Sequence, residues 1–430
     1  MRSMMTSEIV GQYSQAYVWV WLPKANAPIV AGLLSKNGPQ LVFNYGRSYL
    51  ARKDAIALYM PELPKQAGII SPLPGLSMPS CIRDASPDAW GRRVLINRKL
   101  GLKGRNNVEV ELDELTYLLE SGSDRIGALD FQRSPTEYLS RQTQQPSLAD
   151  LLMAAEHVEH GEPLSPELDQ ALLHGSSLGG ARPKAMLDDN SRKLIAKFSA
   201  SADLYSVVKA EFIAMRLAHK VGLNVAHVNL CSVMGKDVLL IERFDRVRED
   251  NQWQRKIMVS ALTLFGLNEM MARYASYETL AEIIRHRFVN AQGTLRELFS
   301  RMVFNILCGN TDDHARNHAA FWNGHDLVLT PAYDICPQIR SGQEASQAML
   351  IYGTDNKSQL ATCITAASAF LLDPSEAINI VNHQVAVIQH EWQATCAEAR
   401  LNPIDQKLLW RNQFLNDFAF FNAPDGVHIP

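Results

Sequence analysis

Residues Gly309–Asn317 read GNTDDHARN, and Thr330–Pro337 read TPAYDICP. Asp312 and Asn317 stand five residues apart in the first stretch, and Asp334 follows a short strand-like segment, 22 residues after Asp312. Carboxylate and amide oxygens are suitable ligands for a Mg²⁺ ion that is bound together with phosphates. The spacing therefore predicts a loop site in which one carboxylate acts on a substrate while an amide and a second carboxylate hold a metal.

Such a site is typical of phosphoryl transfer. That chemistry needs a carboxylate to take the proton of the acceptor hydroxyl, and it needs oxygen ligands for Mg²⁺ beside the phosphates. In protein kinases one loop supplies an Asp and, five residues later, an Asn, and a second Asp clamps the metal. We therefore expect Asp312 to be the catalytic base, with Asn317 and Asp334 as the Mg²⁺ ligands.

Other interpretations of the same loop stay open at this point. Asp312 and the Asn after it are also typical of ordinary loop capping, and the adjacent Asp313 could replace Asp312, although its separation from that Asn is only four. His314 and His318 have the i, i+4 spacing of a helical zinc pair, but Ala315 stands where that motif has a Glu. Hydrogen-bonded loop histidines are therefore the default interpretation.

The nucleotide half of the site is expected upstream, in Gly175–Lys184, GSSLGGARPK. Glycines let backbone N–H groups approach phosphates closely, and the absence of a G-x-x-x-x-G-K-[ST] pattern excludes a Walker A loop. Lys197 stands 17 residues after Gly180, inside the strand-like Leu194–Phe198. A strand Lys behind a Gly-rich loop grips the phosphates in protein kinases, and Glu211 on the following helix is a weaker expected partner for it.

A rival motif overlaps this loop, because Gly175–Gly179 matches G-x-S-x-G, the nucleophile elbow of α/β-hydrolases. The elbow needs a strand before it and a helix after it. Here the preceding Pro166–Leu173 has a helical pattern, and a strand pattern follows Pro183. This reversed context argues against a serine hydrolase.

Strand patterns fill the first third of the chain. Ala16–Leu22, Pro28–Ser35 and Gln40–Tyr45 are rich in β-branched and aromatic residues, and Asn37-Gly38 between the last two predicts a hairpin. A helix is expected after Ser86-Pro87, with Ser86 as its cap. The polar, Gln-rich stretch 133–147 predicts a domain boundary.

The rest of the chain is predicted to be mixed and then helical. Two short helices at 149–157 and 166–173 precede strands at 185–187 and 194–198, a helix at 207–221, and strands at 225–234 and 238–241. Beyond about Val247 the pattern is helical nearly to the end, with one strand-like break at 327–329. The expected fold class is α+β, with a β-rich unit at 1–145, a nucleotide-binding unit at 146–246 and a helical catalytic unit at 247–430.

Composition limits the class of protein. The chain has 430 residues, of which 47% are hydrophobic and 20% charged, which excludes a mainly disordered chain. A net charge of −3 argues against a free-standing nucleic-acid binder, because phosphate contacts need surplus basic charge. The six cysteines form no C-x-x-C pair and predict reduced core thiols. With no signal peptide in MRSMMTSEIV and no run of 18 apolar residues, we expect a cytoplasmic protein without a membrane span.

With these features assembled, the sequence resembles the HipA family, the Ser/Thr-kinase toxins of bacterial type II toxin–antitoxin modules. The likeness covers most of the chain and rests on an ordered set: the β-rich N-terminal part, SSLGGARPK, LIAKF, LLIERFDR, NTDDHARN and PAYDI. The resemblance implies a β-rich N-terminal subdomain followed by a two-lobed protein-kinase-like fold with a large α-helical C-terminal lobe.

The resemblance also implies roles for individual residues. Ser177, or Ser176 beside it, falls where the family carries an autophosphorylated serine whose modification pulls the loop out of the nucleotide site and switches the kinase off. Lys197 would hold the ATP phosphates, Glu242 and Phe244 would lie at the adenine hinge, and the Asp and Asn roles above would be retained. The implied nucleotide-binding set is Ser177, Leu178, Gly179, Gly180, Ala181, Arg182, Lys184, Lys197, Glu242 and Phe244. Phe244 is equally typical of core packing.

The implied cofactors are ATP and Mg²⁺. The implied partners are a HipB-like helix-turn-helix antitoxin, operator DNA reached mainly through that antitoxin, and a protein substrate of the translation machinery, typically an aminoacyl-tRNA synthetase. Two other functions stay open. A degenerate kinase fold would act only as a binding module in an antitoxin–DNA complex, and a small-molecule phosphotransferase would share the Asp and Asn chemistry without needing the N-terminal β-rich part.

Overall fold

The computed structural model describes residues 9–10, 13–100, 111–141, 146–162, 164–173, 180, 182–189, 191–200, 203–340, 342 and 344–430. Helices and strands are mixed along the chain, which confirms the α+β class. The chain forms two compact units: unit 1 is Met1–Ala202, Ser232–Val259 and Trp322–Gly324, and unit 2 is Asp203–Cys231, Ser260–Phe321 and His325–Pro430. The boundaries predicted at 145 and 246 do not coincide with junctions between these units, so the three-part division stays a prediction.

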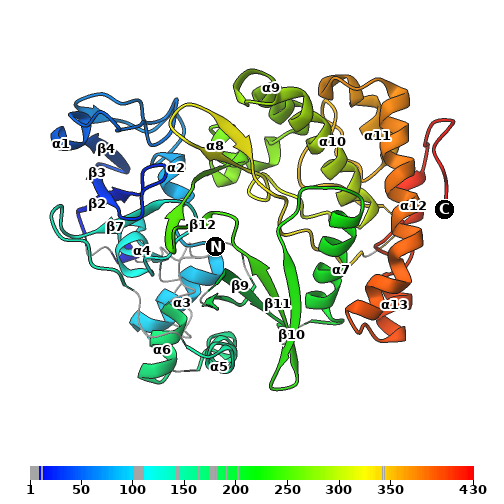
Figure 1. Ribbon diagram of the computed structural model, residues 1–430, viewed down its shortest axis with the longest axis horizontal. Coiled ribbons are helices and arrows are strands. Elements are labelled where there is room, and N and C mark those ends of the chain that lie inside the picture. The colour runs from blue at the N-terminus through cyan, green and yellow to red at the C-terminus, as the bar shows by residue number, and fades with distance from the viewer. Residues whose placement is uncertain are drawn as a thin grey trace, which may run out of the picture. The chain divides into compact units, whose positions relative to one another are not determined.

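Unit 1 begins with an antiparallel sheet in the order β5-β4-β3-β2-β7 (Figure 1). Its strands are β2 (Gln15–Val20), β3 (Ile29–Asn37), β4 (Gln40–Tyr45), β5 (Ile69–Ile70) and β7 (Leu129–Gln132), and β1 (Ile9–Val10) pairs separately with β6 (Glu111–Leu112). Asn37 pairs with Gln40, so the β3–β4 loop is Gly38-Pro39, and Gly38 has the positive φ of 58° that favours glycine. The three strands and the hairpin predicted here are confirmed.

The helices of unit 1 are α1 (Arg47–Leu50), α2 (Ser80–Arg83), α3 (Ala89–Leu100), α4 (Glu114–Glu120), α5 (Leu148–His160) and α6 (Pro166–Leu173). The two short helices predicted before the Gly-rich loop are confirmed. The predicted cap of α3 is wrong: the helix begins at Ala89, and the Ser86 hydroxyl donates instead to the Glu114 carboxylate at 3.0 Å. The Glu114 carboxylate, which is also paired with Arg92, thus competes successfully for a hydroxyl that could have capped the helix.

A second sheet of unit 1 carries the predicted nucleotide-binding strands. Here β9 (Lys193–Phe198) lies between β8 (Lys184–Asp188) and β11 (Lys236–Glu242), antiparallel to both. The junction between the units falls within β10 (Val228–Val233). These strands were expected from the sequence, and Lys197 occupies the central strand β9.

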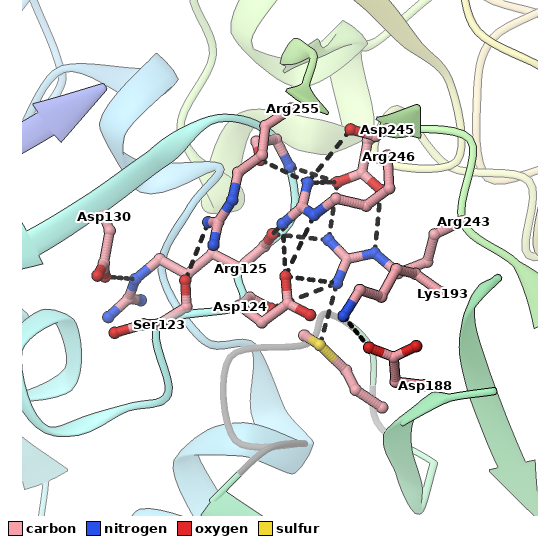
Figure 2. Close-up of polar contacts among 12 residues, drawn as sticks. Ser123, Asp124, Arg125, Asp130, Asp188, Lys193, Arg243, Asp245, Arg246 and Arg255 are labelled. Atoms are coloured by element: carbon pink, nitrogen blue, oxygen red, sulfur yellow. Dashed lines mark hydrogen bonds and ion pairs between the residues drawn. The ribbon is translucent and has the colours of Figure 1, made fainter. Parts of the chain in front are cut away.

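A buried network of charged side chains holds the chain after β11 to the segment after α4 (Figure 2). The Asp245 carboxylate accepts from Arg243 Nη2, from Arg246 Nη1 and from the Gly127 N–H, each at 2.8 Å. Asp124 accepts from Arg246 Nη2 at 2.7 Å and pairs with Arg243 Nη1 at 3.1 Å. Since buried charges are tolerated only when they are paired and hydrogen-bonded, this network fixes how the two segments meet.

The prediction of a helical chain after Val247 is wrong over the next residues. This stretch contains β12 (Arg246–Glu249), β13 (Gln252–Arg255) and β14 (Ile257–Ser260), and β12 and β13 form a hairpin. The turn is Asp250-Asn251, with φ values of 48° and 61°, which Asp and Asn adopt more readily than most residues. The strands are largely polar, so the alternation of apolar residues that reveals most strands is missing here.

Unit 2 is mainly helical. Its elements are α7 (Val207–Lys220), α8 (Ala261–Leu264), η2 (Glu269–Tyr274), α9 (Tyr277–Arg287), α10 (Ala291–Leu307), β16 (Leu327–Leu329), α11 (Leu360–Thr365), η3 (Ala367–Phe370), α12 (Pro374–Glu398), α13 (Pro403–Leu409) and η4 (Asp417–Phe420), and β15 (Ala319–Trp322) ends at the junction. The long helix α12 begins with a capping box and packs against α7 and α10 (Figure 1). The predicted helix at 207–221 and the strand at 327–329 are confirmed.

Two further predictions concern the cysteines and membrane-spanning helices. All six cysteines are free thiols, and all except Cys231 are buried. Within the described ranges, no helix is both long and apolar enough to cross a membrane.

Candidate active site

The predicted catalytic loop of unit 2 follows the C-terminal end of the buried helix α10. At its end Gly309 adopts a φ of 73°, and a Cβ there would lie 2.7 Å from the carbonyl oxygen of Gln413. Only glycine combines this backbone conformation with so close an approach of another main chain. The sharp exit from α10 therefore depends on Gly309 and sets the direction of the following loop.

Hydrogen bonds within the loop from Asp312 to Asn317 hold its conformation. The His314 N–H donates to the Asp312 carbonyl at 2.8 Å, and the Asn317 N–H donates to the His314 carbonyl at 2.8 Å. The Asn317 side chain is buried and its Nδ2 also donates to the Asp312 carbonyl, at 3.2 Å. Because Nδ2 is used in this way, Oδ1 of Asn317 is left as the atom that can accept or bind a cation.

Asp312 is exposed, and its carboxyl nevertheless has a raised pKa. The largest cause is loss of hydration to the surrounding protein atoms; the negative charges of Asp334 and Asp313 act in the same direction, and His314 opposes them. A carboxylate with a raised pKa accepts a proton more readily, which suits a general base. The effect of Asp334 also places its charge near that of Asp312.

The structure separates the roles of the two adjacent aspartates. Asp313 is 2% exposed, accepts a hydrogen bond from the Tyr277 hydroxyl, and lies 3.0 Å from Nε2 of His318. Burial opposes ionisation of Asp313, but His318 and Tyr277 outweigh it and lower the pKa of its carboxyl. Asp313 thus fixes the loop to α9, while Asp312 faces solvent. His318 is engaged by Asp313, as the interpretation of hydrogen-bonded loop histidines expects.

Asp334 adopts an unusual backbone conformation. Its φ is 59°, in the left-handed region that few residues other than glycine enter without cost. The preceding Tyr333 donates its hydroxyl to the Arg316 carbonyl at 2.7 Å, and the following Ile335 is buried, so the segment is held on both sides of Asp334. Strain of this kind is concentrated at functional positions, where the surrounding structure enforces it.

A buried polar cluster that was not predicted from the sequence holds the start of the loop. Asn310 Nδ2 donates to Asn305 Oδ1 at 2.9 Å, and Gln347 Nε2 donates to the Asn310 carbonyl at 3.0 Å. Arg301, 2% exposed, donates to the Thr330 carbonyl at 2.9 Å. Asn305 and Arg301 on the apolar helix α10 were the available signals, since polar residues at core positions of a helix usually bind something.

The side chains present fit Mg²⁺. Asn317 supplies an amide oxygen and Asp334 a carboxylate, and Mg²⁺ is commonly bound by one or two carboxylates together with substrate phosphates. Across the described part of the chain, no group of three or more His, Cys, Asp or Glu side chains is arranged to hold a metal by itself. A metal at Asn317 and Asp334 would thus depend on ligands from the nucleotide.

The predicted nucleotide-binding residues of unit 1 include two opposed lysines. Lys184 on β8 stands directly opposite Lys197 on β9, and both are 7% exposed. Residues directly opposite each other in an antiparallel pair project from the same face of the sheet. Two lysines on one face of the sheet are suited to bind phosphate oxygens.

The remaining predicted nucleotide residues fall into two groups. Gly180, with a φ of 88°, and the half-buried Arg182, Glu242 and Phe244 are described, and Glu242 ends β11. Ser176, Ser177, Leu178, Gly179 and Ala181 lie outside the described residues. Glu211 is buried on α7, and its pairing with Lys197 stays a prediction.

Two family models match the chain. The model of the HipA N-terminal domain matches residues 20–132, and that of the HipA-like C-terminal domain matches residues 176–392, more than half of the chain. The chain belongs to the HipA family. Residues 176–184 of its predicted Gly-rich loop, the strand Lys and the predicted catalytic residues fall within the HipA-like C-terminal domain.

Relatives with the HipA name or a kinase name share part of the sequence. The Serine/threonine-protein kinase toxin HipA of Shewanella oneidensis is 25% identical over 186 residues, which is 37% of this chain. The match spans 42% of the toxin's own length, less than half of it. Y4mE of Sinorhizobium fredii, a candidate kinase by name, is 25% identical over 318 residues, covering 68% of this chain and 71% of Y4mE.

A solved structure shares the HipA fold. The HipA chain in the Shewanella oneidensis MR-1 complex of HipA, HipB and operator DNA has a TM-score of 0.64 and 19% sequence identity, covering 90% of this chain and 93% of that one. The likeness spans both HipA domains, so the β-rich N-terminal part belongs to the shared fold.

A charge network that was not predicted from the sequence surrounds Glu242 and Phe244, the residues expected at the adenine hinge. Arg243 and Asp245 alternate with the half-buried Glu242 and Phe244 and are themselves buried. The signal was the pattern of charged residues around one aromatic in RFDR, immediately after an apolar strand. Charges at that spacing on an extended segment share one face, which predicts a buried ion pair.

Proposed function

We propose that this HipA-family chain is an ATP- and Mg²⁺-dependent Ser/Thr protein kinase. The observation that carries the proposal is the cluster in unit 2: the Asp312 carboxyl with a raised pKa, the charge of Asp334 near it, and the free Oδ1 of Asn317. These are a base and two oxygen ligands for a metal, the groups that phosphoryl transfer needs. The opposed lysines of β8 and β9 support the nucleotide half.

In this mechanism the protein contributes mainly positioning and charge. Asp312 accepts the proton of a Ser or Thr hydroxyl and directs its oxygen toward the γ-phosphorus. The new O–P bond forms as the bond to the β,γ-bridging oxygen breaks, and ADP leaves. Asn317 and Asp334 hold the metal, and Lys184 and Lys197 hold phosphate oxygens. Bound Mg²⁺ supplies neutralisation of the charge that develops on the transferred phosphoryl group.

We also propose the biological setting of HipA toxins for this chain. The partner is a HipB-like helix-turn-helix antitoxin through which the chain reaches DNA, a proposal supported by the fold shared with the HipA chain of a HipA, HipB and operator DNA complex. The net charge of −3 is consistent with phosphate contacts made by that partner. The substrate is a protein of the translation machinery, and Ser177, or Ser176, is autophosphorylated to switch the kinase off.

The experiment is phosphoryl transfer from labelled ATP by the purified chain, with Mg²⁺, to itself and to proteins of a lysate. Asp312→Ala should lower the rate of transfer by at least about 100-fold, because a positioned base contributes about that much. Asp425→Ala removes an exposed carboxylate of the same unit and should leave the rate unchanged.

Equal labelling by wild type and Asp312→Ala would contradict the assignment of the base. Binding of MgATP without transfer to any protein would favour the degenerate binding module. Transfer confined to a sugar or antibiotic hydroxyl would favour the small-molecule phosphotransferase. Mapping of the labelled serine, with Ser177→Ala and Ser176→Ala, identifies the switch residue.

A further inference from the structure

The end of the Gly-rich loop is held by a helix from the N-terminal domain. The Gly180 N–H donates to Oδ2 of Asp88 at 2.9 Å, and the Gly180 carbonyl accepts from the Trp90 N–H at 3.0 Å. Asp88 immediately precedes α3, and Trp90 is in its first turn. One glycine thus has both of its main-chain polar groups bonded to the start of α3.

The contact involves the first turn of α3, whose backbone N–H groups need acceptors from outside the helix. The first N–H groups of a helix have no acceptor within the helix, so the Gly180 carbonyl satisfies the Trp90 N–H. The first helical hydrogen bond, from the Arg92 N–H to the Asp88 carbonyl at 2.8 Å, shows that α3 is already formed at this point. The loop is therefore bonded to a regular element.

A third contact fixes the other end of the segment. The indole Nε1–H of Trp90 donates to the Lys184 carbonyl at 2.9 Å, and the Trp90 side chain is fully buried. Residues 180 and 184 are thus both bonded to α3, with Arg182 and Pro183 between them. A side chain without solvent exposure has few alternative positions, so the indole sets the start of β8.

The conformation of Gly180 makes the contact specific. Its φ of 88° is one that other residues rarely adopt, and a Cβ at this position would overlap the Lys184 ammonium group. The Lys184 side chain therefore passes against the glycine that Asp88 holds. Gly180 therefore lies beside a lysine that stands opposite Lys197 on the sheet.

We propose that Asp88 and Trp90 are positioning residues for nucleotide binding, through which the N-terminal domain fixes Gly180 and Lys184 of the predicted phosphate-binding loop. The inference rests on the proposed kinase function, since it assigns these residues to the same nucleotide site. They precede the loop by about ninety residues and lie in the part matched by the HipA N-terminal domain, 20–132. The β-rich domain is therefore a working part of the nucleotide site.

The test measures the affinity of the full-length chain for MgATP by calorimetry. Asp88→Ala should weaken binding about tenfold, the equivalent of about 1.4 kcal/mol, because the glycine N–H loses a charged acceptor. Asp88→Asn keeps an oxygen of the same reach and should restore most of the affinity. Arg93→Ala, on the exposed surface of the same helix, should bind as wild type does.

Two measurements separate positioning from stability of α3. Asp88→Ser retains a residue that caps helices well but lacks the reach of the carboxylate, so it should weaken MgATP binding as Asp88→Ala does. In the labelling reaction, these variants should raise KM for ATP by a larger factor than they lower kcat. The Gly180 amide should also exchange its hydrogen faster in both variants than in wild type.

Equal MgATP affinity of wild type, Asp88→Ala and Asp88→Ser would overturn the positioning role and leave the kinase proposal intact. Restoration of affinity by Asp88→Ser would also overturn it, since a helix cap would then explain the effect. A wild-type chain that binds no MgATP would overturn the kinase proposal and, with it, the role of Asp88 and Trp90.

Discussion

Two groups of aspartates on loops of this chain have opposite electrostatic surroundings. Asp245 in unit 1 is 2% exposed and is bonded by the guanidinium groups of Arg243 and Arg246. Burial opposes its ionisation, but these guanidinium groups outweigh burial and lower the pKa of Asp245. Asp312 in unit 2 is exposed, and both the loss of hydration and the charge of Asp334 raise the pKa of its carboxyl.

The difference distinguishes a structural cluster from a candidate catalytic one. In the first cluster each carboxylate already has its cations, so the network is complete and its function is to join two segments of unit 1. In the second, the charges of Asp334 and Asp313 raise the pKa of the Asp312 carboxyl, an effect that a nearby cation would offset.

The largest expected effect tests the structural cluster. Asp245→Ala should lower the free energy of unfolding by about 3–5 kcal/mol, because it leaves two buried guanidinium groups with only Asp124 as a shared carboxylate. The loss should be fully present above pH 3.8, the ordinary Asp pKa, and should shrink as the pH falls through the lower folded pKa, where the wild-type carboxylate is itself protonated. Denaturant unfolding at a series of pH values measures it.

The matched control is Glu137→Ala, which removes an exposed carboxylate from the same unit. It should change the unfolding free energy by less than about 0.5 kcal/mol. If Asp245→Ala were as mild as this control, the network would not be what joins the segments. Reduced MgATP binding in a stable Asp245→Ala protein would instead give the network a second role.

The same contrast explains how much of the molecule could be predicted from its sequence. Strands β2, β3 and β4 follow from their apolar patterns, and the Asp312, Asn317 and Asp334 set follows from chemistry at a fixed spacing. The hairpin of β12 and β13 could not be found, because its strands are polar and apolar periodicity is the main signal of a strand.

Contacts between segments that are far apart in the chain could not be predicted from the sequence either. The bond from Gly180 to Asp88 joins residues 92 positions apart, and that from Asp245 to Gly127 joins residues 118 positions apart. Nothing local marks either pair, since Asp before a helix is equally consistent with a simple cap. Ser86 shows the converse: a good local cap signal was wrong because the Glu114 carboxylate binds the hydroxyl.

A prediction with a smaller effect tests whether the Asp312 and Asp334 carboxylates lie close together. Asp334→Asn should lower the pKa of Asp312, because it removes a negative charge that raises it. Asn tolerates the positive φ at position 334 better than most residues, so the backbone should be retained. Carboxyl NMR titration measures the shift, with Asp425→Asn as the control. An unchanged Asp312 pKa would mean that the two carboxylates are too far apart to share a cation.

The smallest effect concerns the stability cost of Asp312 itself. Its folded pKa lies above the unfolded value of 3.8, so the folded chain prefers the protonated form. Stability is therefore unaffected below pH 3.8 and is lost as the pH rises through the folded pKa. Asp312→Asn mimics the uncharged acid and should raise the unfolding free energy near neutral pH by less than about 1 kcal/mol, a gain that disappears as the pH falls toward 3.8.

The adjacent Asp313 is the matched control, because its pKa is lowered and the sign must reverse. Asp313→Asn should destabilise the chain at neutral pH by about 1–3 kcal/mol, since the buried carboxylate bonds to Tyr277 and His318 are weakened. Thermal unfolding of both variants across the same pH range compares them directly. If both substitutions destabilised the chain equally at every pH, Asp312 would belong with the paired carboxylates of the first cluster, and its assignment as a base would lose its electrostatic support.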